Sequence, residues 1–117
     1  MTHLENAHDL PPLVQRAILR LIRAFAPERI VLFGSHAKGR VHIRSDVDLL
    51  LTAKFDDRRF FHQRRARQLA GDSFPRMDIV LAAPEEIAEA PAAKSPFLQS
   101  ILSTGITIYQ RQPSDEN

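Results

Sequence analysis

The sequence predicts a single α+β domain in which helices pack on a mixed β-sheet. A chain of 117 residues fits one domain and can bury a core. Its 44% hydrophobic and 26% charged residues are ordinary globular values, which excludes a disordered chain. Short apolar runs and segments of helical periodicity follow one another in the order helix, strand, strand, helix, strand, helix, helix, strand. We find no repeat or linker that would divide the chain.

The first three elements have clear local causes. The proline pair at 11–12 can open a helix, because a proline in the first turn loses no hydrogen bond. Residues 29–33 (RIVLF) predict a short buried strand that stops at Gly34. Residues 47–52 (VDLLLT) predict a second strand. Its three successive leucines indicate burial on both faces, so we expect this strand in the centre of the sheet.

The middle of the chain predicts a helix and a third strand. Asp56 or Asp57 is expected to cap a helix that runs to about Ala70 and stops at Gly71. The third strand is expected over residues 76–81 (RMDIVL).

The last elements are shorter. Pro84 opens a short helix, residues 97–103 have helical character, and residues 106–109 (ITIY) predict the final strand. The domain as a whole is expected to have flexible ends. The predicted segments are a flexible N-terminus at 1–10, the domain at 11–111 and a flexible tail at 112–117.

The composition excludes several classes of protein. Without cysteine, the chain has no disulfide scaffold, no thiol nucleophile and no cysteine-ligated zinc or iron–sulfur site. The five histidines lack zinc-binding spacing. No apolar run approaches the roughly 20 residues of a membrane span, and the N-terminus lacks the features of a secretory signal. We therefore expect a cytoplasmic protein without a membrane partner.

The positive charge is carried mainly by arginine. The net charge of +2 does not require nucleic acid, and no nucleic-acid partner is expected. Thirteen arginines stand against three lysines, and arginine binds phosphates and carboxylates in a bidentate manner. Five arginines crowd the helix around residues 58–67, which is either a solvated face or a docking surface for an acidic partner or nucleic acid. Phe60 and Phe61 are interpreted as core contacts of this helix.

Three aspartates form the candidate catalytic group. Asp46 and Asp48 stand two apart at the head of a strand, so their side chains point to one face. Close carboxylates repel one another, and a divalent cation such as Mg²⁺ resolves that conflict. If the third strand lies beside the second, Asp78 can share this face. The alternatives are a solvated Asp-x-Asp at a strand edge and an Asp78 paired with Arg76.

A glycine and a serine precede the aspartates. Gly34 ends a strand and permits a sharp turn with a close approach to a ligand. Ser35 and the backbone N–H groups behind it can hold a phosphate, and Lys38 and Arg44 can add positive charge. The stretch is neither a GxxxxGK[ST] loop nor a GxGxxG turn.

Together these residues resemble the minimal nucleotidyltransferase (MNT) domain of the DNA polymerase beta-like nucleotidyltransferase superfamily. The stretches GSHAKG, SDVDLLL and MDIVL carry the resemblance, which spans most of residues 12–110. The matching residues are Gly34, Ser35, Lys38, Gly39, Ser45, Asp46, Asp48 and Asp78. Many relatives have arginine where this chain has Lys38. Lysine keeps the positive charge but cannot bind a phosphate in a bidentate manner.

The resemblance implies a fold, an activity and a partner. It implies the polymerase beta-like fold and the transfer of AMP from ATP. Two Mg²⁺ ions would be held by Asp46, Asp48 and Asp78, the catalytic residues. It also implies an antitoxin that modifies a tyrosine of a HEPN-domain toxin, because no second, acceptor-binding domain is expected. The implied nucleotide-binding residues are Gly34, Ser35, Lys38, Arg44 and Ser45.

Two other functions remain open at this point. One is the same chemistry acting on a small molecule or an RNA end, and the other is a non-catalytic antitoxin that masks its toxin. We expect the toxin to dock near the mouth of the site, against the arginine-rich helix at 58–67. The preferred base and the oligomeric state, homo- or hetero-oligomeric, are left open.

Overall fold

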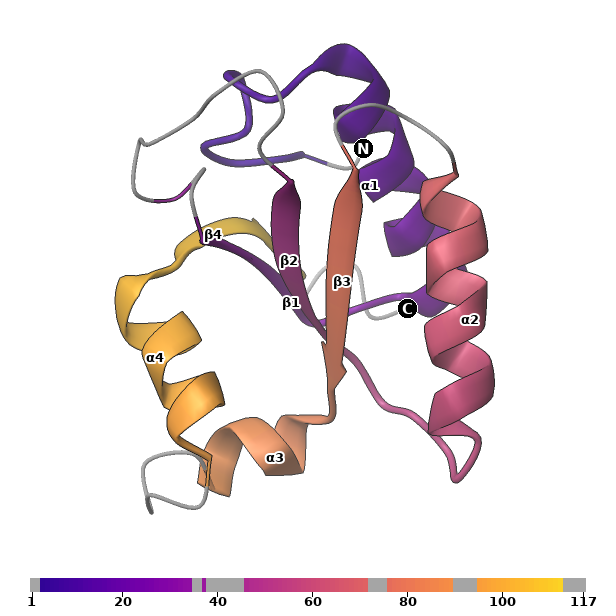
Figure 1. Ribbon diagram of the computed structural model, residues 1–117, viewed down its shortest axis with the longest axis vertical. Helices are drawn as coiled ribbons and strands as arrows, with labels where there is room; N and C mark the ends of the chain where they lie inside the picture. The colour runs from indigo at the N-terminus through magenta and orange to yellow at the C-terminus, as the bar shows by residue number, and fades with distance from the viewer. Residues whose placement is uncertain (1–2, 35–36, 38–45, 72–75, 90–94, 113–117) are drawn as a thin grey trace.

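The computed structural model describes residues 3–34, 37, 46–71, 76–89 and 95–112, and these contain helices and strands in the predicted order (Figure 1). The strand bounds agree with the predicted ones to within one residue. The elements are α1 (Pro12–Phe25), β1 (Arg29–Phe33), β2 (Val47–Thr52), α2 (Arg59–Ala70), β3 (Met77–Ala82), α3 (Pro84–Glu89), α4 (Pro96–Thr104) and β4 (Ile106–Gln110).

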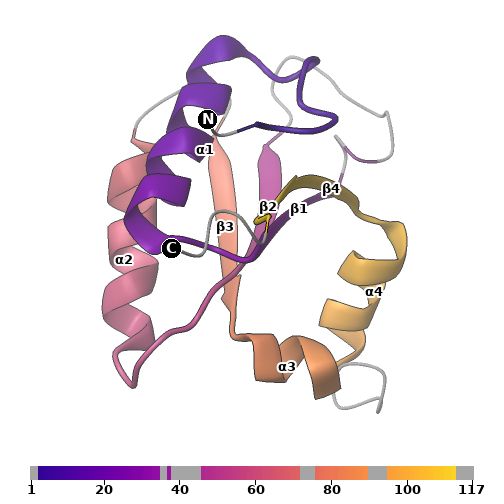
Figure 2. The same ribbon diagram turned by 180° about the vertical axis from the view of Figure 1, so that it is seen from behind.

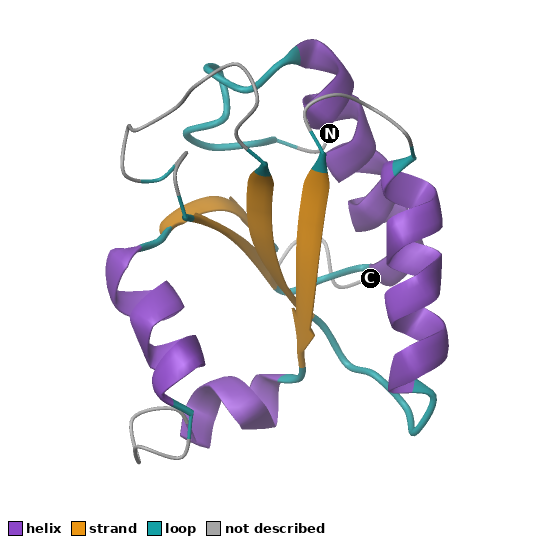
Figure 3. Cartoon of the chain, in the orientation of Figure 1, coloured by secondary structure: helices purple, strands orange, loops and turns teal. Residues whose placement is uncertain are grey.

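The strands form one mixed sheet in the order β3-β2-β1-β4 (Figure 3). Strand β2 pairs in parallel with β3 and antiparallel with β1, and β1 pairs antiparallel with β4. The central position predicted for β2 is confirmed, because Leu49, Leu50 and Leu51 are fully buried. A parallel pair needs a crossover between its strands, and α2 provides it between β2 and β3.

Helices cover both faces of the sheet (Figures 1 and 2). On one face, α1 and α2 enclose the larger core, to which β2 contributes Val47, Leu49 and Leu51. On the other face, Leu50 belongs to a smaller core with residues of α4. Successive side chains of a strand point to opposite faces, so odd-numbered residues of β2 face α1 and α2, and even-numbered residues face α3 and α4.

Part of the N-terminal segment packs against the domain. Ala7 and Leu10 are buried in the larger core, and Leu4 packs against it. The backbone N–H of Glu5 donates to the carbonyl of Ile108 in β4 at 2.7 Å. The few apolar side chains among residues 3–10 therefore pack against the domain that was predicted to begin at residue 11. The flexibility of either end stays a prediction.

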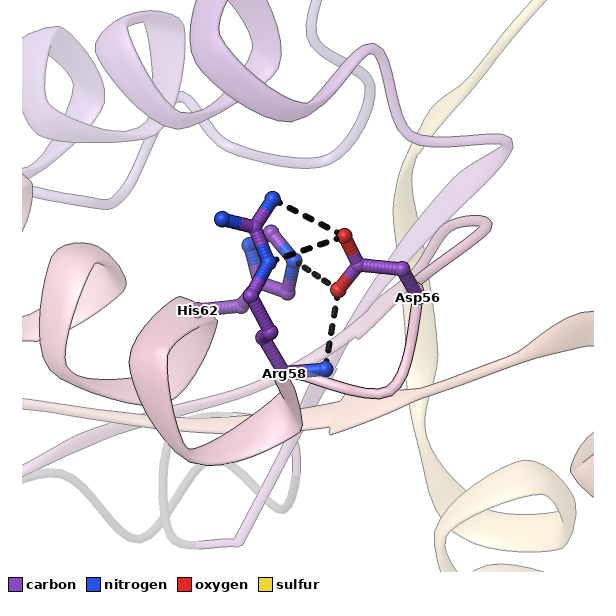
Figure 4. Close-up of polar contacts among 3 residues, drawn as sticks. All are labelled: Asp56, Arg58 and His62. Carbon is purple, nitrogen blue, oxygen red and sulfur yellow. Dashed lines mark hydrogen bonds and ion pairs between the residues drawn. The ribbon is translucent and has the colours of Figure 1, made fainter.

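Helix α2 begins later than predicted, and its N-cap is Arg58 rather than Asp56 or Asp57. The Asp56 carboxylate instead accepts hydrogen bonds from the Arg58 backbone N–H at 2.9 Å and from the Arg58 guanidinium, and it lies 2.9 Å from His62 Nε2 (Figure 4). These contacts, those of the Arg58 side chain first, hold the pKa of Asp56 well below its usual range. Asp56 thus fixes the loop that enters α2.

The prediction that Phe60 and Phe61 are core contacts is wrong. Their side chains are 77% and 54% exposed, respectively. The buried residues of α2 are Ala66 and Ala70, which share one helical stripe at a spacing of four. The two phenylalanines lie off that stripe. Gly71 ends the helix, as predicted.

Candidate functional site

The strand register brings two of the three candidate aspartates together. In the parallel pair of β2 and β3, Asp48 lies directly opposite Asp78. In the antiparallel pair of β1 and β2, Phe33 lies directly opposite Asp48. The row Asp78, Asp48, Phe33 therefore crosses three strands at one end of the sheet. The prediction that the third strand lies beside the second is confirmed.

This row faces the layer of α3 and α4. Leu50 and Val80, two residues beyond Asp48 and Asp78 along their strands, pack in the smaller core with α4. Because side chains two apart share a face, both aspartates point to that side. Both are only partly buried, since they stand at the strand ends rather than over the core. The two carboxylates thus lie where a solute can reach them.

Gly34 allows the turn after β1 to approach Asp48. Its φ of +74° lies in the left-handed region, where glycine carries no steric penalty. A Cβ atom at this position would overlap the Asp48 carboxylate oxygen Oδ2. The Gly34 turn therefore lies close to Asp48, a catalytic candidate, and its close approach to a ligand stays a prediction.

Asp78 has a cationic neighbour in this structure. The Arg76 Nε atom lies 3.5 Å from the Asp78 Oδ1 atom, and the two side chains are 70% and 46% exposed, respectively. This is the ion pair considered as the alternative role of Asp78. An exposed pair contributes at most about 1 kcal/mol, so it leaves the carboxylate available for other ligands.

Asp46 is an exposed residue just before β2. It lies outside the strand ladder, so the sheet does not set its side chain as it sets those of Asp48 and Asp78. Across the described ranges, no three histidine, aspartate or glutamate side chains gather closely enough to hold one metal ion. The three-carboxylate metal site therefore stays a prediction. Asp48 and Asp78 by themselves offer hard oxygen donors on adjacent strands, which fits a Mg²⁺ ion completed by phosphate oxygens and water.

Four of the predicted nucleotide-binding residues lie outside the described residues. They are Ser35, Lys38, Arg44 and Ser45. Of the five residues predicted to bind the nucleotide, the structure describes only Gly34.

An aromatic pair beside the aspartates was not foreseen. Phe97, in the first turn of α4, contacts the ring of Phe33 edge-on, with centroids 6.2 Å apart and planes at 87°. Its side chain remains 56% exposed. The phenylalanines are 64 positions apart in the chain, and the sequence offers no local signal for their contact. They place an accessible aromatic surface on the side of Asp48 that lies away from Asp78.

The arginine-rich helix α2 lies on the opposite face from the aspartates. Ala66 and Ala70 pack in the larger core, and the Gln63 side chain donates to the carbonyl of Ile79 at 2.7 Å. Asp48 and Asp78 point to the other side of the sheet. The expectation of one surface that combines this helix with the mouth of the site is therefore wrong in its geometry.

Comparisons with known proteins agree with the fold. The family model described as polymerase beta, nucleotidyltransferase, matches residues 17–114. That match covers most of the chain, which therefore belongs to the polymerase beta nucleotidyltransferase family. The predicted fold class is confirmed, and the residues that carried the resemblance lie within the matched range.

A solved structure has the same fold. One chain in the crystal structure of a toxin–antitoxin with AMP-PNP is 23% identical over 87% of this chain and 77% of that chain, with a TM-score of 0.57. No curated protein sequence matches the chain significantly. None of the helices in the described ranges has the length and apolar character that a membrane crossing requires.

Proposed function

We propose that this nucleotidyltransferase moves AMP from ATP to a protein hydroxyl, that the acceptor is a tyrosine of a HEPN-type toxin, and that the chain acts as its antitoxin in the cytoplasm. The observation that carries the chemical part is the register of Asp48 with Asp78. It places two carboxylates side by side, beside a glycine turn that closely approaches one of them.

The proposed reaction forms one bond and breaks one. The acceptor oxygen attacks the α-phosphorus of ATP, the bond from that phosphorus to the bridging oxygen of the β-phosphate breaks, and pyrophosphate leaves. Asp78 takes the proton of the acceptor hydroxyl, because it stands at the β3 end of the row, away from the turn after β1. Gly34 and, from the resemblance, Ser35, Lys38, Arg44 and Ser45 bind the triphosphate on the β1 side.

Asp46, Asp48 and Asp78 are the proposed ligands of two Mg²⁺ ions. When bound, the metal would make the acceptor hydroxyl more acidic and neutralise charge on the leaving pyrophosphate. Asp48 lies at the centre of the row, between the acceptor on the β3 side and the triphosphate on the β1 side. Asp46 joins it from the segment before β2.

The proposed partner draws on the comparison with solved structures. The matching chain belongs to a toxin–antitoxin that contains AMP-PNP, an analogue of ATP. That structure and the family match support a nucleotide-dependent antitoxin. The HEPN class of the toxin and the tyrosine acceptor rest on the MNT resemblance.

Co-incubation with the toxin tests the proposal. A purified HEPN-domain toxin is incubated with this chain, ATP and Mg²⁺, and its intact mass is measured. We expect the gain of one or more AMP units on a tyrosine. If wild type and Asp48→Asn protect cells equally and no mass is added, the chain neutralises its toxin by masking. AMP found only on RNA ends or small molecules would instead show that the acceptor is not a protein.

The aromatic pair of Phe33 and Phe97 predicts where the base of the nucleotide binds. With the triphosphate beside Asp48 on the β1 side, the exposed ring of Phe97 is placed to stack on the base. Stacking of a base on an aromatic ring is worth about 1–3 kcal/mol. We expect Phe97→Ala to weaken ATP binding about 10-fold in titration calorimetry with Mg²⁺. Phe60→Ala, at a more exposed phenylalanine on the other face, should leave the affinity unchanged. Equal affinities for all three proteins would remove Phe97 from the site.

A further inference from the structure

The two helices that cover the larger core hold a large share of the positive charge. Together, α1 and α2 contain seven arginines and no lysine, aspartate or glutamate. Because the whole chain carries only +2, the remaining residues together carry five net negative charges. Positive charge is therefore concentrated in these two helices, which cover the face of the sheet opposite α3 and α4 (Figures 1 and 2). Asp48 and Asp78 point to the side of α3 and α4.

Several of these arginines are available to a partner. Arg59 is engaged by the Glu86 carboxylate at 2.5 Å, and Arg58, the N-cap, by Asp56. Arg64, Arg65 and Arg67 are exposed. Within the described ranges, these three arginines form no ion pair with a carboxylate. Helix α2 thus presents guanidinium groups whose natural complement is a carboxylate or a phosphate.

The same helix face exposes aromatic surface. Phe60 is the most exposed of the large hydrophobic side chains in the described residues, and the half-exposed Phe61 lies beside it in the first turn. Phe61, Arg64, Arg65 and Gln68 line a pocket of about 330 Å³. These spacings of three and four place them on one helical face. We call Phe60, Phe61, Arg64, Arg65 and Gln68 the α2 surface.

This combination is typical of a protein interface rather than of a phosphate-binding surface. Aromatic residues and arginine are enriched in the centre of protein interfaces, where lysine is depleted. A general phosphate-binding face has no use for exposed phenylalanines unless bases stack on them. The concentrated positive charge favours an acidic partner, because opposite charges guide the two surfaces together.

We propose that the α2 surface is the docking site of the toxin, through an acidic segment that places carboxylates on Arg64 and Arg65 and an apolar side chain in the pocket at Phe61. The identity of the partner rests on the proposed function, whereas the chemistry of the surface does not. Docking on this face leaves Asp48 and Asp78 uncovered. The antitoxin would hold its partner with one face and modify it with the other.

The test measures binding and AMP transfer separately. Affinity for a purified HEPN-domain toxin is measured by surface plasmon resonance at two salt concentrations, without ATP. We expect Arg64→Glu/Arg65→Glu to weaken binding about 100-fold and Phe61→Ala at least about 10-fold. The matched control is Arg16→Glu/Arg23→Glu, the same charge change on exposed residues of α1, which should weaken binding less than about 5-fold. Raising the salt should weaken wild type more than Arg64→Glu/Arg65→Glu.

The outcomes separate this inference from the proposed function. Three results would overturn the docking site. They are equal binding by wild type and Arg64→Glu/Arg65→Glu, an equal loss of binding in both double variants, and no complex at all. Loss of binding to a single-stranded RNA but not to the toxin would assign the surface to nucleic acid and also overturn it. AMP transfer, read by intact mass, tests the proposed function alone. Circular dichroism of each variant confirms that the domain remains folded.

Discussion

Replacing Asp48 by asparagine is expected to lower the rate of AMP transfer at least about 10³-fold while the domain stays folded. Asp48 is the centre of the row that joins β3, β2 and β1, so it contributes to both the metal and the nucleotide sides of the proposed site. Loss of a metal-coordinating charge removes several kcal/mol of transition-state stabilisation. Asparagine keeps the shape of the side chain and relieves its repulsion of Asp78, so the melting temperature should stay level or rise.

The matched control for this variant is Asp57→Asn. Asp57 is exposed and lies in the loop before α2, outside the sheet. The rate is measured as pyrophosphate release at saturating ATP and Mg²⁺, with the toxin present. Near-wild-type turnover by Asp48→Asn, or an equal loss in Asp57→Asn, would place the chemistry elsewhere.

Gly34→Ala should damage both stability and activity, whereas Gly71→Ala should damage only stability. Both glycines have a positive φ near +74°, a backbone conformation that costs alanine about 1–3 kcal/mol. The two positions differ in the space available for a Cβ atom. A Cβ at Gly34 overlaps the Asp48 carboxylate, whereas the nearest atom to a Cβ at Gly71 is Arg20 Nη2 at 4.0 Å.

The overlap at Gly34 adds a further cost of about 1–3 kcal/mol. It also displaces Asp48, and a misplacement of about 1 Å can cost about 10²-fold in rate. Chemical denaturation gives the two free energies of unfolding, and pyrophosphate release gives the two rates. If both variants lost the same free energy of unfolding and released pyrophosphate at the same rate, the contact between the Gly34 turn and Asp48 would not contribute to catalysis.

Most of the fold could be predicted because its signals are local. The run Leu49–Leu51 is apolar on both faces, and only a central strand of a covered sheet satisfies that pattern. The N-terminal segment could not be predicted in the same way. Its contact with β4 joins Glu5 to Ile108, and such distant pairings leave no periodicity in the sequence.

The site was predictable in its carboxylates and less so in its surroundings. The pairing of Asp48 with Asp78 followed from the expectation that the two strands are neighbours. Phe97 reaches Phe33 only because α4 folds back on the sheet. The face of the sheet that α2 covers is set by the crossover between β2 and β3. The arginines of the helix do not indicate which face this is.

The most direct test of nucleotidyl transfer follows the phosphorus atoms of ATP. The toxin is incubated with this chain and Mg²⁺, in parallel with ATP labelled at the α-phosphate and ATP labelled at the γ-phosphate. Attack at the α-phosphorus predicts that the α label enters the toxin in the wild-type reaction and not with Asp48→Asn. The γ label should appear only in pyrophosphate. Incorporation of the γ label into the toxin, or of neither label, would contradict the assignment of Asp48 and Asp78 to AMP transfer.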